Sequence, residues 1–301
     1  MHDTMSRTAT ITLPAELIDQ VIDHLHDDVL ALRACCITSR AWVSRARYHI
    51  FHDILLSADR ADAFAMLLET SPHISHFVKS LNIKGEADQI FNKSDYLVAV
   101  VPAIAPKLTR LKNLRIDSVT LAHLHPKVLS ALIQGFPELE ELYLSSVTFD
   151  RFRDFAAFIV AHPSLKCLDL GHIWWCDSMK AASRWENVFQ VYPDSPSRLR
   201  SITLNDTSAN VLDWLRSHYR VLPIHNFTHS SVAACLVSPI ARFLHVLGPS
   251  LEHLTFCIHS MPNYAVESHG PSHIESLVSY LDISSGRLNR GRYNIIKHEL
   301  T

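Results

Sequence analysis

The apolar positions near the start of the chain recur at helical spacing in three short segments. Residues 13–25, LPAELIDQVIDHL, carry one broad apolar stripe formed by Leu17, Ile18, Val21, Ile22 and Leu25. Asp27-Asp28 opens a second apolar segment, and a third runs roughly over residues 40–51. We therefore predict three short helices in a unit of about 40 residues, near the lower size limit for independent folding. The apolar side chains of such a unit need cover from the rest of the chain or from a partner.

A second pattern, Pro-x-Leu-x-x-Leu-x-Leu, recurs through most of the remaining chain. It is clearest in PELEELYL (137–144), PSLKCLDL (163–170) and PSLEHLTF (249–256), and looser copies accompany these. Counted by their first apolar residue, the copies begin at positions 78, 111, 139, 165, 199, 222, 251 and 278. The intervals of 23 to 34 residues are irregular, but they are close to the length of a leucine-rich repeat, whose unit is a strand plus a helix.

The segments between the copies have helical periodicity. Apolar residues at i, i+3, i+4 and i+7 occur in residues 152–159 and 240–247, and Pro126 begins a third such segment. In the repeat, neighbouring copies cover the leucines, and the intervening residues face the other side of the strand. The pattern predicts an α/β fold: an N-terminal three-helix unit, then an irregular leucine-rich-repeat-like solenoid with a curved parallel sheet and helices on its convex side.

Two features set this solenoid apart from the most regular repeats. The position that often carries asparagine holds Val119, Val147, Ile173, Thr207 and His259. An asparagine ladder is therefore absent, which favours a looser, long-repeat variety; the alternative is an ordinary α/β domain with leucine-rich strands. The last twenty residues contain no clear copy, so they form a cap, a frayed tail or a divergent end.

Residues 12–55 resemble an F-box. The similarity rests on LPAELIDQVIDHLHDDVLALRACCITSRAW, with its Leu-Pro-x-Glu-Leu start and a Trp at the family's distance, and RARYHIFHDILL resembles the end of that module. The matching positions are Leu13, Pro14, Glu16, Leu17, Ile22, Leu25, Asp28, Leu30, Arg40 and Trp42. Thr38-Ser39 departs from the family's Val-Cys and makes the start of the third helix more polar.

The resemblance implies that this unit docks on the Skp-type adaptor of a cullin–RING ubiquitin ligase. The residues that it assigns to the adaptor interface are Leu13, Pro14, Leu17, Ile18 and Leu30. Four further apolar residues serve either the internal core or the interface: Val21, Ile22, Leu25 and Trp42. For each residue of both sets, packing within the chain is the competing interpretation.

Charge and apolar content narrow the possible partners. The formal net charge is −2 and no long Lys/Arg run occurs, so nothing points to nucleic acid or an anionic membrane. The most apolar stretch, residues 97–105, is short and contains Pro102, whereas a membrane helix needs about 20 residues. Residues 1–12 lack a secretory pattern, and the six cysteines form no C-x-x-C pair. We expect reduced thiols in a protein of the cytoplasm, the nucleus or both.

The chain lacks the short motifs that mark common catalytic and cofactor sites. No G-x-G-x-x-G, G-x-x-x-x-G-K-[ST] or G-x-S-x-G occurs. Close histidine pairs are frequent, yet none has the H-E-x-x-H frame or lies beside a C-x-x-C pair. We expect no catalytic residue, no metal and no cofactor; an enzyme with an unrecognised site is the remaining alternative.

These patterns predict a non-catalytic substrate receptor of a Skp–cullin–F-box ubiquitin ligase. Residues 1–11 would be disordered, 12–55 would form the F-box, 56–285 would bind an unknown target protein, and 286–301 would form a tail or cap. A scaffold that uses the same module without ubiquitin transfer is the alternative function.

The strand residues that alternate with the buried leucines are the candidates for target binding. We expect contacts from Arg115, Tyr143, Asp169, Thr203 and Thr255, with Glu141 and Asn205 beside them. Their mixed charge and aromatic character favours a protein ligand over nucleic acid. Trp174-Trp175 is a further candidate if exposed, although at least one of the two is expected to pack inward.

Overall fold

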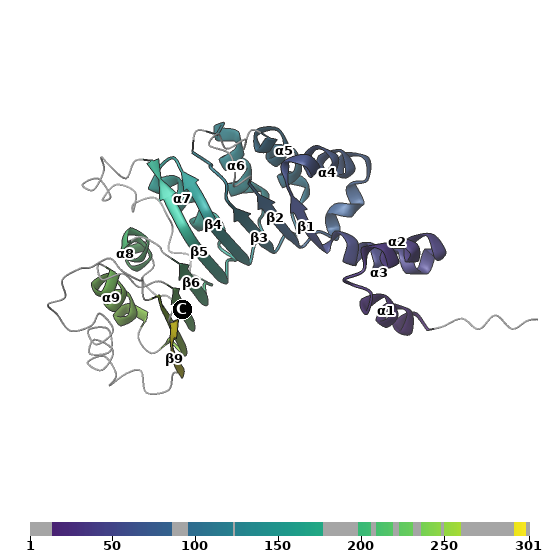
Figure 1. Ribbon diagram of the computed structural model, residues 1–301. Coiled ribbons are helices and arrows are strands. Elements are labelled where there is room, and N and C mark those ends of the chain that lie inside the picture. Colours follow the sequence, from purple (N-terminus) through teal and green to yellow (C-terminus); the bar gives the residue numbers. More distant parts are fainter. Residues whose placement is uncertain are drawn as a thin grey trace, which may run out of the picture.

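The computed structural model describes a helical head followed by a sheet body (Figure 1). The described residues are 14–85, 96–122, 124–176, 198–205, 209–218, 223–230, 236–247, 250–259 and 292–298. Leu13, Thr207 and the repeat copy predicted at 278 lie outside them.

The head consists of the helices α1 (Ala15–Asp23), α2 (Val29–Thr38) and α3 (Arg40–His52). Pro14 is the residue before α1 rather than its first helical residue. The Asp28 carboxylate accepts hydrogen bonds from the backbone N–H groups of the first turn of α2 and so caps that helix. Ser39 caps α3 in the same way, its hydroxyl accepting from the N–H of Ala41 at 3.3 Å. The polar start of α3 is therefore a helix cap.

The head has a small apolar cluster of its own. Ile22, Leu32, Cys35 and Ala46 are buried in it, separate from the main core of the body. The connection to the body runs through the end of α3, which leads directly into the first strand. There Arg47 Nη1 lies 3.0 Å from Nε2 of His73. The head therefore projects from one end of the sheet (Figure 1).

The strands that the structure describes in the body form one nine-stranded parallel sheet and follow each other in sequence order. The strands are β1 (Asp53–Leu56), β2 (Ser80–Lys84), β3 (Asn113–Asp117), β4 (Glu141–Phe149), β5 (Cys167–Trp175), β6 (Ser201–Asn205), β7 (Asn226–Ser230), β8 (His253–His259) and β9 (Arg292–His298). Because each strand pairs only with its neighbours in the chain, the sheet is open and grows by one strand per unit.

Helices connect the strands and lie along the outer side of the bent sheet (Figure 1). They are α4 (Ala58–Thr70), η1 (Pro72–His76), α5 (Tyr96–Ile104), η2 (Ala105–Lys107), α6 (Pro126–Gly135), α7 (Phe152–Val160), α8 (Ala209–His218) and α9 (Val237–Leu247). In the described ranges, no helix has the length and apolar character needed to cross a membrane. The predicted α/β class with a parallel sheet and connecting helices is confirmed.

The leucine pattern places the strands where the sequence predicts for most copies. The first apolar residue of the copies at 78, 111, 139, 165, 199 and 251 is buried two positions before a strand. The copy predicted at 222 is wrong by two residues, because Ile224 occupies that buried position before β7. His229 then lies at the register of Leu204 and Phe256, fully buried. Because this copy has a histidine where the pattern expects its last leucine, the sequence alone did not indicate the correct register.

The sheet also extends beyond the repeat copies at both ends. β1 precedes the first predicted copy and begins within the residues that resemble the F-box end. β9 lies in the final segment and pairs in parallel with β8 over seven residues. That segment therefore continues the sheet by one strand.

Candidate functional sites on the head and the sheet

One side chain from each of β1 to β8 lies in a single row across the sheet face opposite the main core. Two of these side chains, Leu55 and Arg115, are exposed, and the other six are half-buried. Because all eight face away from the core, we call this set the exposed row: Leu55, Asn82, Arg115, Tyr143, Asp169, Thr203, Thr228 and Thr255. All five residues predicted to bind a target belong to it. Leu55, Asn82 and Thr228 were not predicted; the alternation within each strand identifies them once the strand register is known.

The centre of the exposed row combines a cation, an aromatic ring and a carboxylate. The Arg115 guanidinium carbon lies 4.9 Å from the centroid of the Tyr143 ring, a cation–π contact. Asp169 lies on the other side of Tyr143, with its Oδ1 at 3.5 Å from the Asn205 amide nitrogen. Burial raises the pKa of Asp169, and the nearby positive charge of Arg115 partly offsets this.

Glu141 supports this centre from the neighbouring row of the same face. Its Oε2 accepts hydrogen bonds from the Asn113 amide at 2.9 Å and from the Tyr143 hydroxyl at 3.1 Å. Burial, with a contribution from the Glu141 charge, raises the pKa of Tyr143 to about 12. The phenol therefore stays neutral, and its hydroxyl donates a hydrogen bond to Glu141. One hydrogen bond to Glu141 therefore restrains the ring on which Arg115 lies, and the Asn113 amide in turn restrains Glu141.

A backbone feature recurs directly after β3 and within β4 and β5. Ser118, Ser146 and His172 have φ values of 56°, 54° and 52°, in the left-handed region. They follow Asp117, Ser145 and Gly171, which are aligned in the sheet. The chain bends at the same level in three consecutive strands.

Trp174 and Trp175 have different environments after this bend. Trp175 is buried against Phe152, with ring centroids 5.0 Å apart. Trp174 is 51% exposed and stacks with the His172 ring at 5.9 Å. The prediction that at least one packs inward is confirmed. Trp174 adds an exposed aromatic surface near the carboxyl end of β5.

The head exposes an unusual number of apolar side chains. Five of the nine large apolar side chains exposed in the described part lie on α1 and α2. We call these five the exposed head residues: Leu17, Val21, Val29, Leu30 and Ile37. Leu30 and Ile37 are 75% and 88% exposed. Apolar groups concentrated in this way on a small unit mark an interaction surface more often than isolated ones do.

The residues assigned to the adaptor through the resemblance differ in exposure. Pro14, Leu17 and Leu30 are exposed, whereas Ile18 is half-buried against the head cluster. Of the residues left between core and surface, Ile22 is buried and Val21 is exposed. Leu25 and Trp42 are half-buried and pack on the same cluster.

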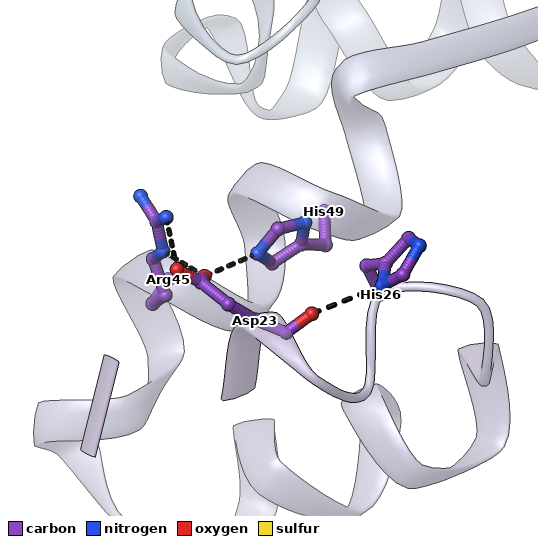
Figure 2. A network of polar contacts seen from close by, with 4 residues as sticks. All are labelled: Asp23, His26, Arg45 and His49. Atoms are coloured by element: carbon purple, nitrogen blue, oxygen red, sulfur yellow. Dashed lines mark hydrogen bonds and ion pairs between the residues drawn. The ribbon is translucent and has the colours of Figure 1, made fainter. Parts of the chain in front are cut away.

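A polar network joins α1 to α3 within the head (Figure 2). The Asp23 carboxylate accepts hydrogen bonds from Nε and Nη2 of Arg45 at 2.5 and 2.6 Å and from Nε2 of His49 at 2.7 Å. His26 Nδ1 lies 3.0 Å from the Asp23 carbonyl oxygen. The Arg45 guanidinium, and after it the His49 ring, hold the pKa of the Asp23 carboxyl well below its usual range. The network restrains the end of the helix that carries Leu17 and Val21.

Replacing Asp23 by Asn is expected to lower the stability of the head by about 1 kcal/mol at neutral pH, a modest value because the pair is partly exposed to solvent. The folded head keeps Asp23 charged at pH values where the unfolded chain binds a proton. The stabilisation is therefore complete above about pH 5, begins to decline as the pH falls below about 4, and is lost progressively toward the lower pKa of the folded state. The wild-type head should lose this stability in acid, and the Asn variant should not.

Urea unfolding at pH 7 and pH 3.5 measures this difference. Trp42 packs on the head cluster, so its resonance in fluorotryptophan-labelled protein reports unfolding of the head. The exposed Asp19 on the same helix supplies the control Asp19→Asn, which should retain the acid dependence of the wild type. Equal acid sensitivity of the wild type and Asp23→Asn would disprove the assignment to Asp23.

The helix side of the body contains a cavity of about 470 Å³ between α6 and α7. Its lining is mixed: Leu124, Leu129 and Phe149 lie beside His125 and Asp154. Burial raises the pKa of Asp154. Among the described residues, no three His, Cys, Asp or Glu side chains gather closely enough to hold a metal ion.

No family model matches the chain, and no curated protein matches its sequence.

Proposed function

We propose that the chain is a substrate receptor of a Skp–cullin–F-box ubiquitin ligase. The head acts as an F-box that binds the Skp-type adaptor, and the exposed row of a leucine-rich-repeat-like body binds the target protein. The chain performs no bond chemistry. It raises the local concentration of the target near the ubiquitin-transfer machinery and orients it there.

The observation that carries this proposal is the exposure of apolar side chains on α1 and α2. A three-helix unit with four buried residues in its cluster has a small apolar core. Nevertheless Leu30 and Ile37 remain on its surface, although Leu32, two residues from Leu30, and Cys36, next to Ile37, pack in the cluster. A partner that covers them removes apolar area from water, which contributes about 25 cal/mol per Å².

The body supports the second half of the proposal. Its buried positions repeat Leu, Leu, Leu, Leu and Ile across β2 to β6, as the pairing of Leu81, Leu114, Leu142, Leu168 and Ile202 shows. Stacked units of this kind form rigid and extended binding faces. The head and the exposed row lie on different parts of the molecule. An adaptor and a target can therefore bind at the same time.

Replacing Leu30 by Asp is expected to weaken binding of a purified Skp-type adaptor at least about 30-fold, because a buried leucine contributes about 2 kcal/mol and the new carboxylate also loses water. Ile37→Asp tests the same surface. Titration calorimetry with the full chain and the adaptor measures both affinities.

Met66→Asp is the matched control, because Met66 is 65% exposed on α4 in the body. It should leave the adaptor affinity unchanged. Wild-type affinity of both Leu30→Asp and Ile37→Asp would refute the assigned interface. Complexes isolated from cells then separate the two functions: adaptor together with a cullin supports a ligase receptor, and adaptor without any cullin supports the scaffold alternative.

A further inference from the structure

The two charged residues at the centre of the exposed row have no ionic partner within the described residues. In the part of the chain that the structure describes, Arg115 contacts the face of Tyr143, and Asp169 accepts one long hydrogen bond, from the Asn205 amide at 3.5 Å. Glu141, in contrast, accepts two good hydrogen bonds on the same face. Arg115 and Asp169 are therefore available to charged groups of a ligand.

The spacing of these two charges is set by the sheet. They lie on β3 and β5, at the same level and with Tyr143 between them. Neighbouring strands are about 4.8 Å apart, so the two backbone positions are separated by roughly 10 Å. An extended segment of the polyproline II type rises about 3.1 Å per residue and returns to the same face every third residue. Residues i and i+3 of such a segment span about 9 Å.

The surroundings of both charges favour a polar, extended ligand. The amide oxygen of Asn82, next to Arg115 in the row, is buried and accepts no hydrogen bond within the described residues. Thr203, Thr228 and Thr255 continue the row with hydroxyl groups. A polyproline II backbone makes no internal hydrogen bonds, so its N–H and C=O groups are free to bond to the Asn82 amide oxygen and the threonine hydroxyls. The half-buried Asp169, whose pKa is raised by burial, is stabilised in its charged form by an incoming cation.

We propose that the exposed row binds an extended segment of a target protein in which an acidic and a basic residue are three positions apart, the carboxylate pairing with Arg115 and the basic group with Asp169. This rests on the proposed function, since it names the chemistry of the target. Charge-assisted pairs of this kind give recognition its specificity.

Selection of peptides from a displayed library on the full-length chain tests this proposal. The probe is a library of ten randomised residues without cysteine. With the wild type, opposite charges at i and i+3 should be enriched over the same charges at other spacings. Arg115→Glu should instead select two basic residues at this spacing, and Asp169→Lys should select two acidic ones. Synthetic peptides with the wild-type pattern should bind either variant at least about tenfold more weakly.

Charge reversals elsewhere serve as matched controls. Lys127→Glu on α6 and Asp62→Lys on α4 change exposed charges of the helices and should not alter the selection. The neutral variants Arg115→Gln and Asp169→Asn, which avoid like-charge contacts, should each lose one charge from the selected pair. Melting curves by circular dichroism confirm that each variant is folded.

The results that overturn the proposal are specific. Selected pairs at i and i+7 would indicate a helical target, and a selection unchanged by either reversal would place binding elsewhere. Adaptor affinity, measured on the same variants, should equal that of the wild type. Selected peptides that bind the exposed row but lack the charge pair would refute this inference and leave the proposed receptor function intact. A wild-type chain that does not bind the adaptor would refute the receptor function itself.

Discussion

Replacing Phe155 by Ala is expected to lower the free energy of unfolding of the body by about 3–5 kcal/mol, the usual cost of removing a buried aromatic ring. Phe155 is fully buried, and its ring centroid lies 5.6 Å from those of Phe149 and Phe152 and 5.8 Å from that of Trp214. These rings come from β4, α7 and α8. The change leaves a cavity at the point where the sheet meets two helices.

Urea unfolding followed by circular dichroism and by the resonance of the buried Trp175 measures this loss. Met66→Ala on α4 is the control, because Met66 is 65% exposed and surface substitutions usually stay within about 0.5 kcal/mol. A decrease below about 1 kcal/mol for Phe155→Ala would show that the aromatic cluster can collapse around the missing ring.

The leucine pattern predicts most of the body because burial in a stacked sheet follows sequence alternation directly. Leu142 and Leu144 enter the core while Tyr143 faces the other side, as a strand requires. The same logic identified the central members of the exposed row before their register was known. What it could not supply was which exposed positions approach each other, since this depends on pairing between strands far apart in the chain.

The failures have particular physical causes. In β7 the buried position of a leucine is held by His229, so counting leucines shifted that copy by two residues. Thr228 was missed for the same reason. β1 is four residues long and directly follows α3. The position that carries the first leucine of a repeat copy, two residues before the strand, therefore lies inside the helix, and the pattern could not be recognised there. The left-handed residues Ser118, Ser146 and His172 carry no local signal, because glycine, the usual residue there, is absent.

In the head, periodicity predicted the helices but not their faces. The apolar stripe of α1 is so broad that some of its residues face the core and others face the solvent. Ile22 turns inward at 1% exposure, and its neighbour Val21 is 55% exposed. Leu32 and Leu30 differ in the same way on α2. Only the position of α3, which packs on both other helices, decides which side is covered.

Replacing Ile22 or Leu32 by Ala is expected to unfold the head while the body stays folded. Each side chain is at most 1% exposed, and such a substitution costs about 2–5 kcal/mol. A unit of this size seldom has more than about 3–5 kcal/mol of stability from its own core. The body is retained because Ile22 and Leu32 belong to the head cluster and not to the main core.

The two parts can be followed separately in one protein. The Trp42 resonance should move to its unfolded position without urea, and the Trp175 resonance should keep its native position. Adaptor binding should fall at least about 100-fold, since the helices that carry the exposed head residues are no longer formed. Leu30→Ala is the matched control: Leu30 is 75% exposed, so the head should remain folded although it binds the adaptor more weakly. Simultaneous loss of both tryptophan signals in Ile22→Ala would mean that the head and the sheet unfold as one cooperative unit, and that the contacts at the end of α3 couple them more strongly than two separate apolar clusters imply.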